Sequence, residues 1–181
     1  MIDLAYMVRR AGVLALVTAA LSACASTPAP GRWSGPSPTG PSASPQILQE
    51  SQPLQCVPFA RSASGVDIYG DAHTWWAQAE GRYPRSHSPA SGSVLVLRGY
   101  EDFNRGHVAV VTAIVSAREI RVDHANWLNR GEISLSVPVL DVSANNDWSQ
   151  VRVWHIPGAQ WGGRIYLVEG FIHAFALPYV S

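Results

Sequence analysis

The segment HVAVVTAIVS, residues 107–116, places the strongest constraint on how this chain can fold. It is almost entirely apolar and rich in β-branched residues, a pattern typical of a β-strand buried on both faces. The next segment, EIRVDHANW at residues 119–127, alternates between charged positions and positions that begin apolar and end in His124 and Asn126. Polar side chains on a core face need hydrogen-bond partners, so these two residues require an explanation.

The two segments fit an antiparallel hairpin that turns near Ser116 and Ala117. In such a hairpin His107 lies opposite His124 or Asn126, and directly paired residues share one face of the sheet. A single buried histidine is usually a hydrogen-bonded core residue. Two histidines and an asparagine at mutually consistent positions favour a functional site instead.

Other short runs of apolar and β-branched residues predict further strands. They lie at residues 93–98, 133–137, 151–156 and 164–172. The chain has 181 residues, of which 47% are hydrophobic, enough for one domain with a substantial core.

A cysteine lies in the segment LQCVPFAR, residues 54–61. Proline fits the first turn of a helix, so Pro58 predicts a helix that begins at Cys56 or Val57. The sulfur then lies at a helix N-terminus, where free N–H groups and the helix dipole favour a thiolate. A second helix is expected within residues 65–81, with Asp71 as its N-cap and Gly81 at its end.

The N-terminal residues 1–24 have the features of an export signal. Arg9 and Arg10 precede an apolar run that is too short to span a bilayer comfortably, and small residues follow. The sequence LSAC also resembles a bacterial lipobox, which makes Cys24 a predicted lipidation site and anchors the protein to a membrane of the cell envelope. The alternative is an ordinary signal peptide cut near Ala23 or Ala25.

Residues 25–51 are rich in Pro, Ser, Gly and Thr and predict a disordered linker, because they cannot bury enough apolar area to offset the entropy of ordering. The chain contains two cysteines. If Cys24 is acylated or removed with the signal peptide, Cys56 has no partner in the chain. It is then a buried residue, an intermolecular link or a reactive thiol.

The charge of the chain argues against nucleic acid as a partner. The formal net charge is zero, and no basic stripe or acidic tail is present. The six histidines show no spacing typical of a metal site, so no metal is expected. No other cofactor is expected either. The protein is expected to be a monomer.

Four motifs together resemble one known family. They are CVPFAR, GDAHTWW, GHVAVV and DHANW, in that order. They resemble the CHAP domain, a cysteine- and histidine-dependent amidohydrolase or peptidase of the NlpC/P60 papain-like superfamily. The resemblance implies an α+β, NlpC/P60-like fold in which N-terminal helices carrying the cysteine pack on an antiparallel sheet carrying the histidine. The expected catalytic domain covers residues 52–158. Residues 159–181 form a C-terminal extension, read as an extra strand or an edge cover.

The resemblance also implies the catalytic roles. Cys56 is the nucleophile and His107 is the base, held as an imidazolium beside a thiolate. The family often has Glu-x-Asn where this chain has His124-Ala125-Asn126. Asn126 matches that pattern and His124 departs from it, although histidine is the usual third residue in the neighbouring NlpC/P60 group. His124 is favoured as the group that orients His107, with Asn126 as the alternative.

The implied substrate is peptidoglycan, cut at the muramoyl-alanine amide or within the stem peptide or cross-bridge. Four aromatic residues near the motifs are candidates for binding it: Tyr69, Trp75, Trp76 and Trp127. Adjacent tryptophans on a helix can instead belong to the core. Two other functions remain open: a non-catalytic envelope lipoprotein that binds through the same fold, and a cysteine transferase or deamidase acting on proteins.

Overall fold

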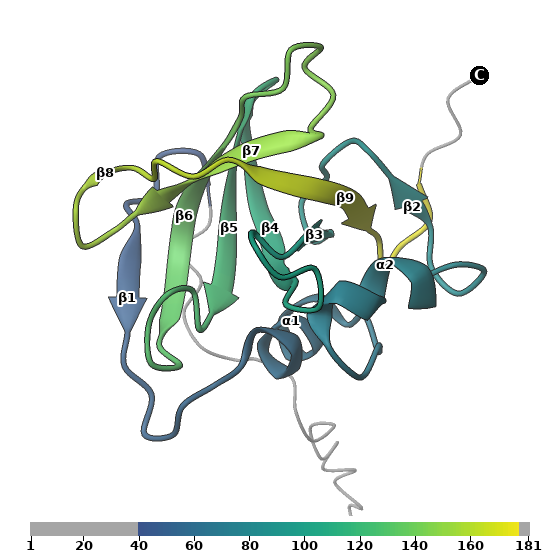
Figure 1. The fold of residues 1–181 in the computed structure, drawn as a ribbon, viewed down its shortest axis with the longest axis horizontal. Coiled ribbons are helices and arrows are strands. Elements are labelled where there is room, and N and C mark those ends of the chain that lie inside the picture. The colour runs from purple at the N-terminus through teal and green to yellow at the C-terminus, as the bar shows by residue number, and fades with distance from the viewer. Residues whose placement is uncertain (1–39, 178–181) are drawn as a thin grey trace, which may run out of the picture.

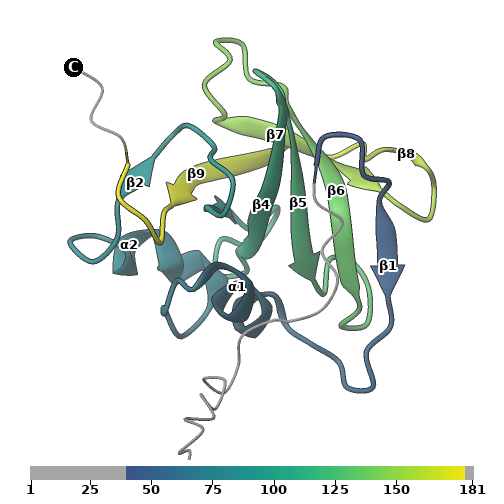
Figure 2. The same cartoon turned by 180° about the vertical axis from the view of Figure 1, so that it is seen from behind.

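A computed structural model describes residues 40–177, and the expected export signal with Cys24 lies outside this range. These residues form nine strands. Figures 1 and 2 show the short helical segments gathered at one end of the sheet. The elements in chain order are β1 (Gln46–Leu48), α1 (Cys56–Ser64), the 3₁₀ helix η1 (Ala72–Thr74), α2 (Trp75–Gln78), β2 (Arg85–Ser86), β3 (Val94–Leu97), β4 (His107–Ser116), β5 (Glu119–Ala125), β6 (Ile133–Asp141), β7 (Gln150–His155), β8 (Gln160–Trp161) and β9 (Tyr166–Ile172). Within this range no helix is long and apolar enough to cross a membrane.

Six of the strands form a closed antiparallel barrel. Their order is β6-β5-β4-β3-β9-β7, and β7 pairs with β6 to close the ring. The predicted α+β, papain-like fold is therefore wrong, because the structure is mostly β and the described helices are short. The sheet closes into a barrel because β9 pairs with both β3 and β7. From the sequence, this segment was expected to lie outside the catalytic domain, as an extra strand or an edge cover.

The interior of the barrel is filled by alternate residues of its strands. Because side chains in a strand point to opposite faces in turn, one set from each strand faces inward. The buried members of this cluster are Leu95, Leu97, Ala109, Val111, Ile120, Val122, Val137, Val139, Trp148, Val151, Val153, Tyr166 and Phe171. In β4 and β5 the same inward parity ends in His107 and His124, so both histidines lie at the rim of the barrel.

A second cluster lies between the outer face of the barrel and α1. Phe59 and Ala60 of the helix pack against Val108 and Val110 of β4. Phe59 is fully buried, and burial of such a side chain stabilises the fold by about 2 kcal/mol. This contact fixes the helix, and therefore its first residue, against the strand that begins with His107.

Most of the expected strands are confirmed. As predicted, β4 is buried on both faces over residues 107–111, but its second half is not, since Ile114 is exposed. The expected second helix is divided into η1 and α2, with Asp71 at the N-cap of η1 but without a side-chain capping bond. The expected linker at residues 25–51 is wrong at its end, because β1 pairs there with β6.

Candidate active site

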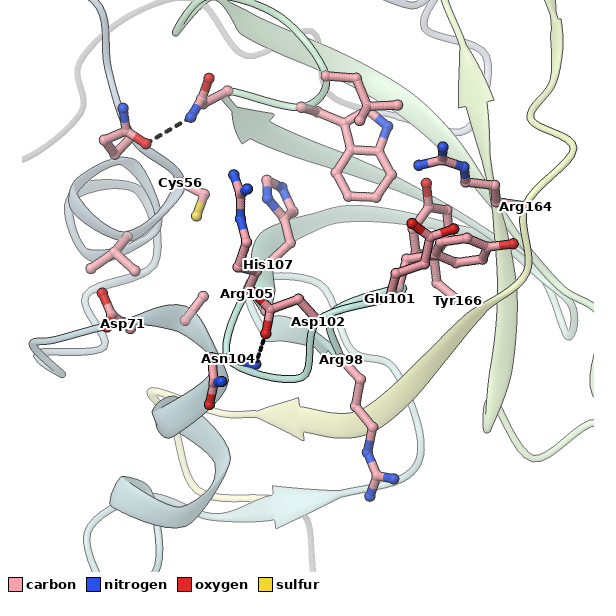
Figure 3. Close-up of a pocket in the computed structure, with 18 of the residues that line it drawn as sticks. Cys56, Asp71, Arg98, Glu101, Asp102, Asn104, Arg105, His107, Arg164 and Tyr166 are labelled. Carbon is pink, nitrogen blue, oxygen red and sulfur yellow. Dashed lines mark hydrogen bonds between the residues drawn. The ribbon is translucent and has the colours of Figure 1, made fainter.

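Cys56 is the first residue of α1. Gln55 is its N-cap in an extended conformation, and the N–H of Phe59 donates to the carbonyl oxygen of Gln55 at 3.2 Å. The predicted start of the helix is therefore confirmed. Cys56 is half-buried and is a free cysteine. Figure 3 shows Cys56 at the start of α1 and His107 on the sheet lining the same pocket.

The surroundings of the Cys56 sulfur have opposing effects on the pKa of its thiol. Burial raises the pKa of the Cys56 thiol, and this is the largest effect. The backbone N–H groups of Val108, Val57 and Cys56 itself lower the pKa in part, because they donate hydrogen bonds that stabilise a thiolate. The net shift is upward, so the thiol form is favoured at neutral pH.

His107 begins β4 and is held by a second histidine. Its Nε2 atom lies 3.1 Å from Nδ1 of His124, and the two rings meet edge to face with centroids 5.1 Å apart. His124 is almost completely buried on the inner face of β5. The contact predicted from the hairpin is confirmed, and it occupies Nε2 of His107 rather than Nδ1.

Burial lowers the pKa of His107 to about 3. The pKa of His124 is held well below its ordinary value by burial and, second, by the neighbouring charge that His107 would carry. Desolvation disfavours the charged forms of thiol and imidazole alike. The expected imidazolium–thiolate pair is therefore corrected to a neutral thiol beside a neutral imidazole.

Asn126 is placed differently from His124. It has a left-handed backbone with φ of 57°, and its Nδ2 donates to Oε1 of Gln55 at 2.7 Å. Its own N–H donates to the carbonyl oxygen of Glu132. The side chain is thus tied to the residue before Cys56, and the hydrogen bond to His107 comes from His124.

Trp127 covers the two histidines. Its ring lies 4.7 Å from that of His107 and 5.4 Å from that of His124, with the second pair stacked. Tyr166 of β9 contacts the other side of Trp127 at 4.9 Å. The aromatic rings contribute to the burial of the imidazoles, and burial is the main cause of their lowered pKa values.

The site opens into a cleft of about 750 Å³ that is lined by Cys56, His107, Asn126 and Trp127, among others. The remaining predicted aromatics do not line it. Tyr69 is exposed and lies under the guanidinium of Arg61. Trp75 is completely buried in the core, so its predicted contact with substrate is wrong.

Trp76 also lies away from the cleft. Its ring packs at the place where a Cβ on Gly170 would lie, and the guanidinium of Arg85 lies over it. Both adjacent tryptophans therefore support the fold, and the alternative reading of this pair as core residues holds.

The polar wall of the cleft was not predicted from the sequence. Figure 3 shows it, formed by the loop between β3 and β4 and by the start of β9. Its charged members are Arg98, Glu101, Asp102 and Arg105 in the loop and Arg164 just before β9, and Asp71 at the N-cap of η1 also lines the cleft. The dense charge of RGYEDFNRG at residues 98–106, between two buried strands, was the available signal.

The arginines of this wall differ in whether they form an ion pair. Arg98 forms a bidentate ion pair with Glu169 of β9, whereas the guanidinium of Arg105 has no ion-pair partner among residues 40–177. Arg164 lies over the ring of Tyr100 at 4.7 Å. Among the same residues, no group of three or more His, Cys, Asp or Glu side chains is arranged to hold a metal ion.

A comparison with models of protein families matches part of this chain. The family model described as "CHAP domain" matches residues 48–126, a range that includes Cys56, His107, His124 and Asn126 and confirms the resemblance seen in the motifs. No curated protein matches the chain. The matched range ends before β6, β7 and β9, the strands that complete the barrel.

Proposed function

Because this chain contains a CHAP domain, we propose that it hydrolyses amide bonds of peptidoglycan, with Cys56 as the nucleophile and His107 as the base. The family indicates a peptidoglycan hydrolase or amidase in general. The observation that carries the finer proposal is the hydrogen bond of 3.1 Å between Nε2 of His107 and Nδ1 of His124. It holds the ring of His107 so that Nδ1 is free to accept the proton of the Cys56 thiol.

The first chemical step couples proton transfer to attack. The thiol proton passes to Nδ1 of His107 as the sulfur bonds to the carbonyl carbon of the amide, because neither charged form is favoured beforehand. The imidazolium that forms on His107 continues to donate its Nε2–H to Nδ1 of His124. In this reading His124 stabilises a charge that exists only during the reaction, as the third residue of other triads does.

The developing oxyanion needs donors beside the sulfur. The backbone N–H groups at the start of α1, those of Cys56 and Val57, lie next to the thiol. A positioned donor of this kind lowers the barrier by roughly 3 kcal/mol. His107 then gives its proton to the leaving amine, the C–N bond breaks, and water hydrolyses the thioester to release the acid and the thiol.

The cleft carries charges of both signs, and its arginines can bind the carboxylates of a peptide beside the acidic residues Asp71, Glu101 and Asp102. Arg105 and Arg164 line it, and guanidinium groups bind carboxylates in a two-pronged geometry. Trp127 gives an apolar surface beside His107. We therefore place the stem peptide of peptidoglycan along the wall formed by the β3–β4 loop and the start of β9.

Export and anchoring complete the proposal. The lipobox-like LSAC and the Pro-rich residues after it suit an enzyme tethered by acylated Cys24 to a membrane of the bacterial envelope. A single acyl chain binds a membrane only marginally, so stable attachment needs more than one chain on that residue.

The test is digestion of purified cell wall followed by mass analysis of the released muropeptides. The wild type is expected to release fragments with new amine and carboxyl ends, and their masses identify the cleaved amide. Cys56→Ala is the blank and Ser62→Ala, a substitution on the same helix outside the cleft lining, is the matched control. Retention of the protein on cell wall without any released fragment would instead indicate a binding module.

A further inference from the structure

One nitrogen of His124 has no partner in the arrangement described above. Its Nδ1 contacts His107, whereas its Nε2 is buried and makes no hydrogen bond within the described part of the chain. The whole residue is 2% exposed. A buried polar atom without a partner is unfavourable, so this atom requires one.

The position of the proton on each ring follows from the proposed function. If Nδ1 of His107 accepts the thiol proton, then His107 carries its own proton on Nε2 and donates it to Nδ1 of His124. His124 must then carry its proton on Nε2. The unpartnered atom is therefore an N–H donor that needs an acceptor.

His124 also lines a second, much smaller pocket, which adjoins the cleft at Trp127 and Leu128. It has a volume of about 50 Å³, and its lining includes His124, Glu132, Ser134 and His155. A water molecule needs about 10–15 Å³ of such space and two to four polar partners, so the pocket has room for at least one.

Ser134 is placed to serve such a water. It lies directly opposite His124 in the pairing of β5 with β6, and directly paired residues share a face. Ser134 is buried, and its hydroxyl makes no hydrogen bond to another described residue. Glu132, which directly precedes β6 and also lines this pocket, has a carboxylate that accepts a hydrogen bond from Gln49 at 3.3 Å.

We propose that this cavity holds one water molecule that accepts the Nε2 proton of His124 and donates to the hydroxyl of Ser134 and to the carboxylate of Glu132. Ser134 is then a positioning residue. Through the water it fixes the proton of His124 on Nε2, which keeps Nδ1 of His124 as an acceptor and Nδ1 of His107 free for the thiol. The active site thus extends from Cys56 through two imidazoles to Ser134, across the rim of the barrel.

Two substitutions of Ser134 separate the hydroxyl from side-chain volume. Ser134→Thr and Ser134→Val have nearly the same shape and disturb packing equally, but only threonine keeps the hydroxyl. We expect kcat for peptidoglycan hydrolysis to be roughly fivefold lower in the valine variant than in the threonine variant, with KM unchanged, as for the loss of one hydrogen bond. Equal kcat values in the two variants would overturn the role of Ser134.

A second measurement needs no substrate and no variant. The ¹⁵N chemical shifts of the imidazole nitrogens in the wild-type chain at pH 7 report which nitrogen carries the proton. We expect the Nε2 proton on both His107 and His124, and a proton on Nδ1 of His124 would overturn the inference. If the wild type does not hydrolyse peptidoglycan, the proposed function fails, but this measurement still decides the state of His124.

Discussion

Acid should destabilise this protein through His107, and the size of the effect follows from its burial. The pKa of His107 is lowered to about 3 in the folded state, against about 6.5 in an unfolded chain. Below pH 6.5 the unfolded chain therefore binds a proton that the folded protein does not bind. The contribution of His107 to stability is complete above pH 6.5 and is lost as the pH falls toward 3.

The magnitude at a chosen pH can be stated. A pH of 5 lies about 1.5 units below the pKa of this histidine in the unfolded chain, and each unit corresponds to about 1.4 kcal/mol. His107 alone should then lower the free energy of unfolding by roughly 2 kcal/mol between pH 7 and pH 5. His124 shifts in the same direction and adds to the wild-type loss.

The assay is urea denaturation at pH 7 and pH 5 on the wild type and His107→Gln. The loss of stability between the two pH values should be smaller in the variant by roughly 2 kcal/mol, because the titrating ring is gone while the carboxylates remain. His87→Gln is the matched control, since His87 is exposed. An identical loss in the wild type and in His107→Gln would refute the claim that His107 is buried in the neutral form.

Three further predictions follow from the same structure. His124→Ala should lower kcat roughly 10- to 100-fold because it removes the acceptor behind His107, and Asn126→Ala should have a smaller effect; an inactive Asn126→Ala beside a near-normal His124→Ala would reverse the assignment of the orienting group. Cys24→Ser should move the protein from the detergent phase to the aqueous phase in a partitioning assay, and equal recovery of both forms in the aqueous phase would show that the protein is not anchored. Gly170→Ala should lower stability by roughly 1–3 kcal/mol, because a Cβ there lies 2.5 Å from the Trp76 ring and φ is +147°; an unchanged melting temperature would contradict the tight packing of β9.

The parts of this structure that sequence predicted depend on local patterns. Pro58 predicts the helix that starts at Cys56 because its ring fits only the first turn. The contact between His107 and His124 follows from the period of two in paired strands, and it survives irregularities in the β4–β5 register. These features depend on neighbours in the chain or on a single hairpin.

The closure of the barrel depends on pairings between residues far apart in the chain. β9 pairs with β3, so that Phe171 lies opposite Leu95, and nothing in the local sequence of either strand identifies the other. The segment of β9 therefore read as an added strand rather than a wall of the barrel. The missed cleft residues Arg164 and Tyr166 belong to the same stretch of chain.

The direction in which a side chain points was the second feature that could not be predicted from the sequence. Trp75 and Trp76 are adjacent in a helical segment of the chain, so both matched an aromatic binding site as well as a core. Only packing against Gly170 and the barrel shows that neither reaches the cleft. The neutral state of the thiol and imidazole was missed for a related reason, since desolvation depends on burial that the sequence does not state.

The central claim is that the Cys56 thiol performs the hydrolysis, and alkylation of that thiol tests it most directly. The chain has two cysteines, so a Cys24→Ser background leaves Cys56 as the sole target of iodoacetamide. Residual hydrolysis of purified cell wall is measured against the fraction of Cys56 alkylated, determined by mass analysis of its peptide. We predict a linear fall to zero activity at one label per chain. Persistent hydrolysis by fully alkylated protein would contradict the account.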